Sequence, residues 1–200
     1  NNLSKIIKPD IGVITNISYA HIKNFKNLQG IAKAKSEIIN NIVSNGSIIL
    51  NADDQFYNYF KSKALKKKLK IISFSKSKKK NSNIILKKFI NLKNTSIVKI
   101  NVNGILKSFI IKKNFKIYID NILATLAVIS NFTDLDNISK KLFFNYKFLK
   151  GRGDKSHIKI YDKKINFIDE SYNSNPLSLS FAINRFSNLE NKSKKKIVLL

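Results

Sequence analysis

The sequence of 200 residues contains no cysteine, no methionine and no tryptophan. The absence of cysteine excludes disulfide scaffolds, thiolate zinc sites and cysteine nucleophiles. No apolar run approaches the roughly eighteen residues of a membrane-spanning helix, and no basic and apolar leader opens the chain. We therefore expect a cytoplasmic protein without a membrane partner.

Acidic residues are also scarce, since 12 Asp and Glu face 38 Lys and Arg and the formal net charge is +26. Such a charge is typical of proteins that bind nucleic acid or anionic membranes. Only Arg152 and Arg185 are arginine, however, whereas proteins that read phosphates and bases usually enrich arginine for its bidentate geometry. We interpret the lysines as solvated surface residues and expect no nucleic-acid partner. Nucleic-acid binding stays the competing hypothesis.

The remaining composition, 43% hydrophobic and 25% charged, is that of a folded globular chain. Short apolar strands alternate with longer amphipathic helices along the first part of the chain. After a helical end at residues 3–7, strands are predicted at 12–17, 47–50 and 71–74, and helices at 27–43 and 56–69. This alternation predicts an α/β fold with a mostly parallel sheet and right-handed crossovers.

The later part of the chain changes character. Residues 84–111 are strand-rich, and Asn103-Gly104 between two apolar runs is a strong hairpin signal. We place a domain boundary near residue 148. Further elements are predicted as helices at 120–129, 137–144 and 177–186, and as strands at 157–161 and 165–168 joined by a turn at 162–164.

One lysine has an unusual place on the helix predicted for residues 27–43. Lys35 comes four residues after Ile31 and three before Ile38, so it lies on the apolar stripe of the helix. An ammonium in that place extends to the surface, pairs with an acid such as Glu37, or loses its proton because burial lowers its pKa. Periodicity alone leaves these possibilities open.

Polar residues follow the first two predicted strands. His21 comes soon after the first strand, and Asp53 and Asp54 follow the second in Asn51-Ala-Asp-Asp54. Ligands gather beyond the carboxyl ends of parallel strands, so His21 could bind a ligand, or it could be a capping or partly buried imidazole. Asp53 and Asp54 could hold a cation or cap the next helix.

A second polar group lies beyond the predicted boundary. It consists of the glycine-flanked arginine in Gly151-Arg-Gly153 and of the loop Asp169–Pro176. The glycines let the backbone approach closely while the guanidinium reaches an anion, and acids at a strand end can accept hydrogen bonds from ribose hydroxyls or hold the waters of a metal. An interdomain hinge with a capping arginine is the alternative.

Five segments follow one another in a distinctive order. They are Thr15-Asn-Ile-Ser-Tyr-Ala-His-Ile-Lys-Asn-Phe25, Leu28-Gln-Gly-Ile-Ala-Lys-Ala-Lys-Ser-Glu-Ile38, Asn51-Ala-Asp-Asp54, Gly151-Arg-Gly153 and Asp169-Glu-Ser-Tyr-Asn-Ser-Asn-Pro176. In this order they resemble the Mur ligases of peptidoglycan synthesis. The last segment resembles the MurF type, which adds D-alanyl-D-alanine to UDP-N-acetylmuramoyl-tripeptide.

The resemblance implies an ATP-dependent ligase that forms an amide bond through an acyl phosphate. It implies that Lys35 becomes a carbamate that helps to organise Mg²⁺, and that His21 is a magnesium ligand. Asn121 corresponds to the asparagine that binds adenine, and Arg152 to the arginine that the C-terminal domain brings to the nucleotide. Glu170 corresponds to the acid at the ribose, where the family usually has aspartate. A monomer is expected.

The same resemblance implies that the chain is a fragment. Residues 1–147 correspond to a central ATP-binding domain that is truncated on its N-terminal side, since the sequence has no Gly-x-x-Gly-Lys-Thr phosphate loop. Residues 148–200 correspond to the start of a Rossmann-like C-terminal domain. We expect this polypeptide alone to be inactive. Another Mur-type or folylpolyglutamate-type ligase is the enzymatic alternative, and a degenerate, non-enzymatic module is a further one.

Overall fold

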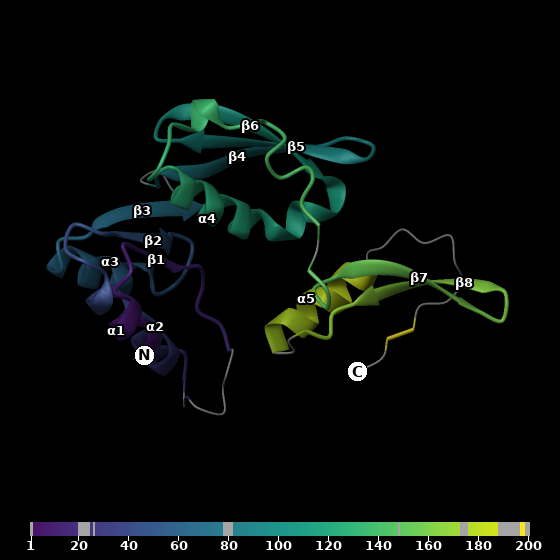
Figure 1. Ribbon diagram of the computed structural model, residues 1–200, viewed down its shortest axis with the longest axis horizontal. Helices are drawn as coiled ribbons and strands as arrows, with labels where there is room; N and C mark the ends of the chain where they lie inside the picture. Colours follow the sequence, from purple (N-terminus) through teal and green to yellow (C-terminus); the bar gives the residue numbers. More distant parts are fainter. Residues whose placement is uncertain are drawn as a thin grey trace. The chain divides into compact units, whose positions relative to one another are not determined.

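The computed structural model describes residues 2–19, 25, 27–77, 82–147, 149–172, 176–187 and 197–198. Its internal contacts divide the chain into two compact units. The first consists of Asn1–Ser18 and Phe25–Tyr146, and the second is made mainly of Lys147–Leu200. Figure 1 colours the elements of both units along the chain. Within the described part of the chain, no helix has both the length and the apolar character needed to cross a bilayer.

A single six-stranded sheet forms the first unit, with its strands in sequence order. The strands are β1 (Ile11–Ile14), β2 (Ser47–Asn51), β3 (Lys70–Ser75), β4 (Ile84–Asn91), β5 (Thr95–Val102) and β6 (Ile105–Lys112). The pairs from β1 to β4 are parallel, whereas β5 is antiparallel to both β4 and β6. The predicted α/β class with a mostly parallel sheet is confirmed.

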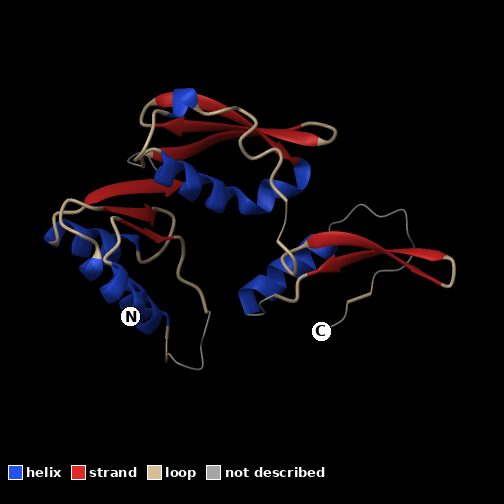
Figure 2. Ribbon diagram, viewed as in Figure 1, coloured by secondary structure: helices blue, strands red, loops and turns tan. Residues whose placement is uncertain are grey.

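Helices cover both faces of the parallel strands (Figure 2). They are α1 (Asn2–Ile7), α2 (Leu28–Asn41), α3 (Tyr57–Lys66) and α4 (Ile119–Ile129), with the 3-10 turns η2 (Lys113–Tyr118) and η3 (Leu135–Asn137). Ile48 and Leu50 of β2 join Ile39 of α2 and Phe60 of α3 in one buried cluster. Ile49 points to the opposite face because side chains alternate along a strand, and α4 packs against β2, β3 and β4.

Local signals fix several of these elements. The side chain of Asn27 accepts a hydrogen bond from the Gly30 N–H at 2.9 Å and so caps α2. Asn103 and Gly104 both have positive φ, 48° and 96°, as a two-residue hairpin turn requires. The predicted turn between β5 and β6 is therefore confirmed.

The helix predicted at residues 137–144 is wrong. The described chain there has only η3 followed by turns. The Lys140 carbonyl accepts a hydrogen bond from the Ile110 N–H of β6 at 2.8 Å, and the Phe143 ring packs on Phe109 at 5.7 Å. Because the segment bonds to the sheet and packs on it, its tertiary contacts override its helical periodicity.

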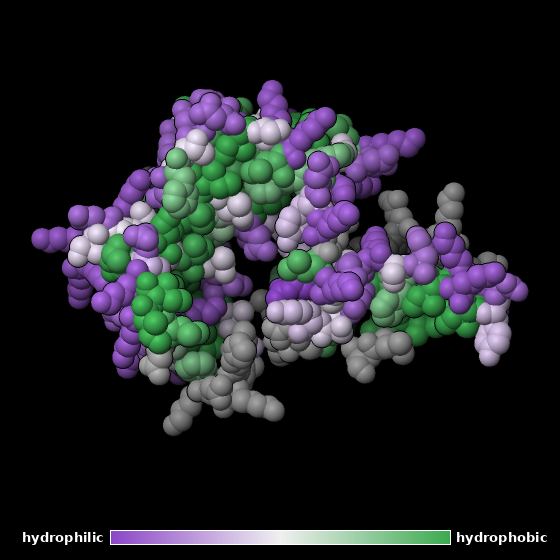
Figure 3. Space-filling model, viewed as in Figure 1, coloured by the Kyte–Doolittle hydropathy of each residue, from purple (hydrophilic) through white to green (hydrophobic). Residues whose placement is uncertain are grey.

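The second unit contains an antiparallel hairpin of β7 (Asp154–Ile160) and β8 (Lys163–Asp169), and the helix α5 (Pro176–Ser187). The chain turns at Tyr161 and Asp162, which both have positive φ, and not at residues 162–164. One face of the hairpin carries Ile158, Ile160, Ile165 and Phe167, each about two-fifths to one-half exposed at 39–47%. Figure 3 shows this apolar face in green.

Candidate functional site

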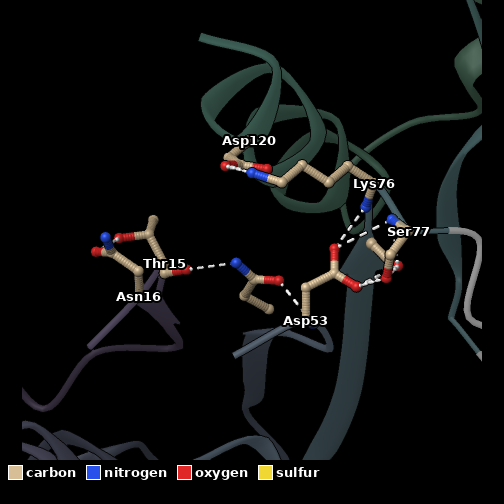
Figure 4. Close-up of polar contacts among 8 residues, drawn as sticks. Thr15, Asn16, Asp53, Lys76, Ser77 and Asp120 are labelled. Atoms are coloured by element: carbon tan, nitrogen blue, oxygen red, sulfur yellow. Dashed lines mark hydrogen bonds and ion pairs between the residues drawn. The ribbon is translucent and has the colours of Figure 1, made fainter. Parts of the chain in front are cut away.

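The parallel strands β1, β2 and β3 end at one edge of the sheet, and hydrogen bonds join the residues that follow them. Asn51, the last residue of β2, donates from Nδ2 to the Thr15 carbonyl after β1 at 2.9 Å. Its Oδ1 accepts from the Asp53 N–H at 2.9 Å. One amide side chain therefore ties the segment after β1 to the segment after β2 (Figure 4).

Lys35 of α2 reaches the same edge. Its ammonium donates to the Asn16 carbonyl at 2.9 Å. Although the residue as a whole is exposed, desolvation lowers the pKa of the Lys35 ammonium, and the charge of Asp54 opposes this effect. Of the possibilities left open by periodicity, the structure therefore supports a lysine whose head group lies beside the end of β1 and loses its proton more easily than an ordinary lysine.

His21 falls in residues 20–24, which lie outside the described part of the chain. Its proximity to Lys35 stays a prediction. Among the residues that the structure describes, no group of three or more His, Asp and Glu side chains is arranged to hold a metal ion.

Asp54 fastens the loop after β1 to the start of α3. One of its carboxylate oxygens accepts a hydrogen bond from the Ile17 N–H at 2.6 Å. The other accepts from the Phe56 N–H at 2.8 Å, one residue before α3 begins. Asp54 does not cap α3, whose first turn has no side-chain capping hydrogen bond, and a cation at this carboxylate stays a prediction. Its contact with Ile17 was not predicted from the sequence.

Asp53 holds the three residues at and after the end of β3. Its carboxylate accepts hydrogen bonds from the Ser75 hydroxyl at 2.8 Å, the Lys76 N–H at 2.7 Å and the Ser77 N–H at 3.3 Å, and also from the Ser77 hydroxyl. Desolvation alone would raise the pKa of Asp53, but these hydrogen bonds outweigh it and lower the pKa. Asp53 therefore bonds to the end of β3 and does not cap the next helix, and a cation at this carboxylate stays a prediction.

Asn121 lies in the first turn of α4 and is exposed. Its neighbour Asp120 accepts from the Lys76 ammonium at 2.7 Å. The first turn of α4 is therefore linked to the carboxyl ends of the strands, as Figure 4 shows for Lys76 and Asp120. Sequence reasoning missed Lys76 and Asp120, although Lys76 lies two residues after the third predicted strand, much as Asp53 lies three residues after the second.

In the second unit, the two halves of the predicted polar group lie together. The Gly153 N–H donates to the Asp169 carbonyl at 2.6 Å, and the Tyr172 N–H donates to the Gly151 carbonyl at 3.0 Å. Gly151 has a φ of +72°, and a Cβ there would lie 2.8 Å from the Tyr172 backbone nitrogen, so glycine is required both for its conformation and for the close approach.

Arg152 projects from this turn over an aromatic ring. Its guanidinium carbon lies 4.1 Å from the centroid of the Tyr172 ring, the geometry of a cation–π contact. Glu170 is half-buried and follows β8 directly. The structure therefore brings the arginine turn and the acidic loop together within one unit.

Comparison with known proteins gives consistent matches. Residues 1–129 match the model of the Mur ligase middle domain. The chain is 32% identical over 186 residues to the UDP-N-acetylmuramoyl-tripeptide–D-alanyl-D-alanine ligase of Buchnera aphidicola subsp. Baizongia pistaciae, which covers 93% of this chain and 39% of that protein. The chain thus spans about two-fifths of the length of such curated relatives.

Solved structures show the same similarity. The structure of MurF from Acinetobacter baumannii superposes with a TM-score of 0.74 at 26% identity, over 92% of this chain and 38% of that chain. MurF ligase from Thermotoga maritima, solved in complex with ADP, superposes with a TM-score of 0.65 at 21% identity, over 92% of this chain and 40% of that chain, and so shares the fold.

Proposed function

Because the chain belongs to the Mur ligase family, whose middle domain its residues 1–129 match, we propose that it is part of a ligase that joins D-alanyl-D-alanine to UDP-N-acetylmuramoyl-tripeptide. The observation that carries the proposal is the 32% identity over 93% of the chain to a ligase of that name. In this proposal residues 1–147 belong to the ATP-binding domain and residues 148–200 begin the C-terminal domain. The enzyme is a cytoplasmic monomer.

The proposed reaction has two steps. A carboxylate oxygen of the tripeptide attacks the γ-phosphorus of ATP, the bond to the bridging oxygen breaks, and ADP leaves. The amine of D-alanyl-D-alanine then attacks the acyl phosphate, loses a proton and expels phosphate. The products are an amide, ADP and inorganic phosphate.

Lys35 supports this proposal through its surroundings. Carbamylation needs the neutral amine, and desolvation lowers the pKa of Lys35 toward that form. The Asn16 carbonyl and the Asp54 carboxylate nearby supply the oxygen atoms that Mg²⁺ prefers, so the residues fit this ion. A Lys35 carbamate and His21 would hold Mg²⁺, which would neutralise charge on the transferred phosphoryl group.

The remaining roles concern the nucleotide. Asn121 is proposed to hydrogen-bond the adenine, and its exposed place in the first turn of α4 suits a ligand contact. Arg152 is proposed to bind phosphate, because its stacking on Tyr172 limits its conformations before it binds. Glu170 is proposed to accept from a ribose hydroxyl.

The test uses the complete ligase, expressed from the gene that encodes this chain. Phosphate release with ATP, UDP-N-acetylmuramoyl-tripeptide and D-alanyl-D-alanine is expected, and it should stop in Lys35→Ala. Turnover with D-glutamate or a diamino acid, but not with the dipeptide, would assign the chain to a sibling ligase. Turnover by the isolated 200-residue polypeptide would contradict its assignment as an incomplete enzyme.

A further inference from the structure

A continuous set of polar contacts leads from the strand ends to α4. Asp53 is held through its own N–H by Asn51, whose side chain also reaches Thr15. The Asp53 carboxylate in turn holds the backbone of Lys76 and Ser77. The backbone from which the Lys76 side chain starts is therefore tied to the ends of β1, β2 and β3.

From this fixed backbone the Lys76 ammonium reaches Asp120, 44 positions later in the chain, at 2.7 Å. Both side chains are partly exposed, at 50% for Lys76 and 35% for Asp120. Ion pairs with that exposure contribute little to stability. Such a pair can instead fix the conformation of the turn that carries Asp120.

The first turn of α4 follows η2 without a break. Its N-cap residue, Tyr118, makes no side-chain capping hydrogen bond. The buried side chains of Ile119, Ile122 and Leu123 hold the helix on the sheet. One oxygen of Asp120, Oδ1, is buried without a hydrogen-bond partner among the described residues. The ion pair between the other oxygen and Lys76 therefore offsets the cost of removing this carboxylate from water.

We propose that Lys76 is a positioning residue for nucleotide recognition, which fixes the first turn of α4 through Asp120 and thereby orients Asn121. This inference rests on the proposed function, in which Asn121 contacts the adenine. Lys76 itself does not touch the nucleotide. Without the ion pair, Asn121 has to be ordered when ATP binds, so ATP affinity falls while the chemical step is unchanged.

The test is steady-state kinetics of the complete ligase carrying Lys76→Met. The KM for ATP should rise about 2- to 10-fold, the range expected for ordering one or two side chains on binding. kcat at saturating ATP and the KM for D-alanyl-D-alanine should stay unchanged, and the preference for ATP over GTP should fall. Lys76→Arg keeps the ion pair and should restore the wild-type values.

Two further variants make the outcome decisive. Asp120→Asn should raise the KM for ATP as Lys76→Met does, and the double variant should be no worse than either single one, because both remove the same pair. Lys107→Met removes another ion pair of the same unit, that with Asp136 on η3, and should leave the KM for ATP unchanged.

The failures are distinguishable. A wild-type enzyme without ATP-dependent ligation would overturn the proposed function. An active wild type whose Lys76→Met and Asp120→Asn variants keep the wild-type KM for ATP and the wild-type ATP preference would overturn the positioning role alone. An equal loss in all kinetic constants, together with a lower melting temperature, would show that the pair is only structural and would also overturn it.

Discussion

Replacement of Asp53 by asparagine is the most direct probe of the contacts at the sheet edge. The carboxylate accepts from two hydroxyls, of Ser75 and Ser77, and from two backbone N–H groups, of Lys76 and Ser77. The two hydroxyls can rotate and accept hydrogen bonds from the new amide group. The two backbone N–H groups cannot, so the loss of hydrogen-bond energy falls on them. Hydrogen bonds to a charged acceptor are roughly twice as strong as neutral ones, with a difference of about 1 kcal/mol each. Since Asp53 is only half-buried, we expect a total loss of about 1–2 kcal/mol.

Amide hydrogen exchange of the 200-residue chain measures this loss at the atoms concerned. The Lys76 and Ser77 N–H groups should exchange about 5- to 30-fold faster in Asp53→Asn, which is the factor that corresponds to 1–2 kcal/mol. Asp134→Asn is the matched control, because within the described residues the exposed Asp134 accepts one backbone N–H, that of Asp136, at 3.0 Å. Unchanged exchange at Lys76 and Ser77 in Asp53→Asn would refute the reasoning.

The effect of Asp53 should also depend on pH. Its pKa is lowered in the folded chain from its ordinary value of 3.8, so its contribution to stability is present above that value and is lost as the pH falls through the folded pKa. The difference in stability between wild type and Asp53→Asn should therefore shrink below about pH 4. A constant difference from pH 7 to pH 2 would contradict a charged acceptor.

Three shorter predictions concern the other sites. Gly151→Ala should destabilise the second unit by about 1–3 kcal/mol in thermal unfolding, because its φ is +72° and its Cβ would meet the Tyr172 backbone; an unchanged melting curve would disprove the strain. Tyr172→Leu should raise the KM of the complete ligase for ATP about 2- to 5-fold through loss of the stack on Arg152, and Tyr172→Phe, which keeps the ring, should not. Acylation of Lys35 followed against pH should have a lower midpoint in the folded chain than in urea, because desolvation lowers its pKa, and equal midpoints would exclude this effect.

The sheet and its first helices could be predicted because their signals are local. Short apolar runs bounded by polar residues mark β1, β2 and β3, and the spacing of apolar residues marks α2. Helical spacing predicted Lys35 on the apolar stripe of α2, but the residue is exposed in the structure and only its ammonium is desolvated. The resemblance to the Mur ligases, which rests on the same segments, is confirmed.

The contacts that the sequence did not predict depend on distant residues. Lys76 and Asp120 are 44 positions apart, and nothing near either residue indicates that a lysine after β3 faces the first turn of α4. The role of Asp53 was missed for the same reason, since it depends on β2 and β3 being neighbours in parallel register. The helix predicted at residues 137–144 was wrong because helical spacing contains no information about the hydrogen bond between the Lys140 carbonyl and the Ile110 N–H of β6.

The partly exposed apolar side chains of β7 and β8 have a thermal consequence. A two-stranded ribbon is marginally stable in water unless something covers its hydrophobic side, and Ile160 and Ile165 remain 47% and 43% exposed. The six-stranded sheet, by contrast, buries Ile48, Ile49 and Phe74 completely. Gentle heating should therefore melt the ribbon first and release the arginine turn with it, at temperatures at which the lysine-bearing α2 is still folded.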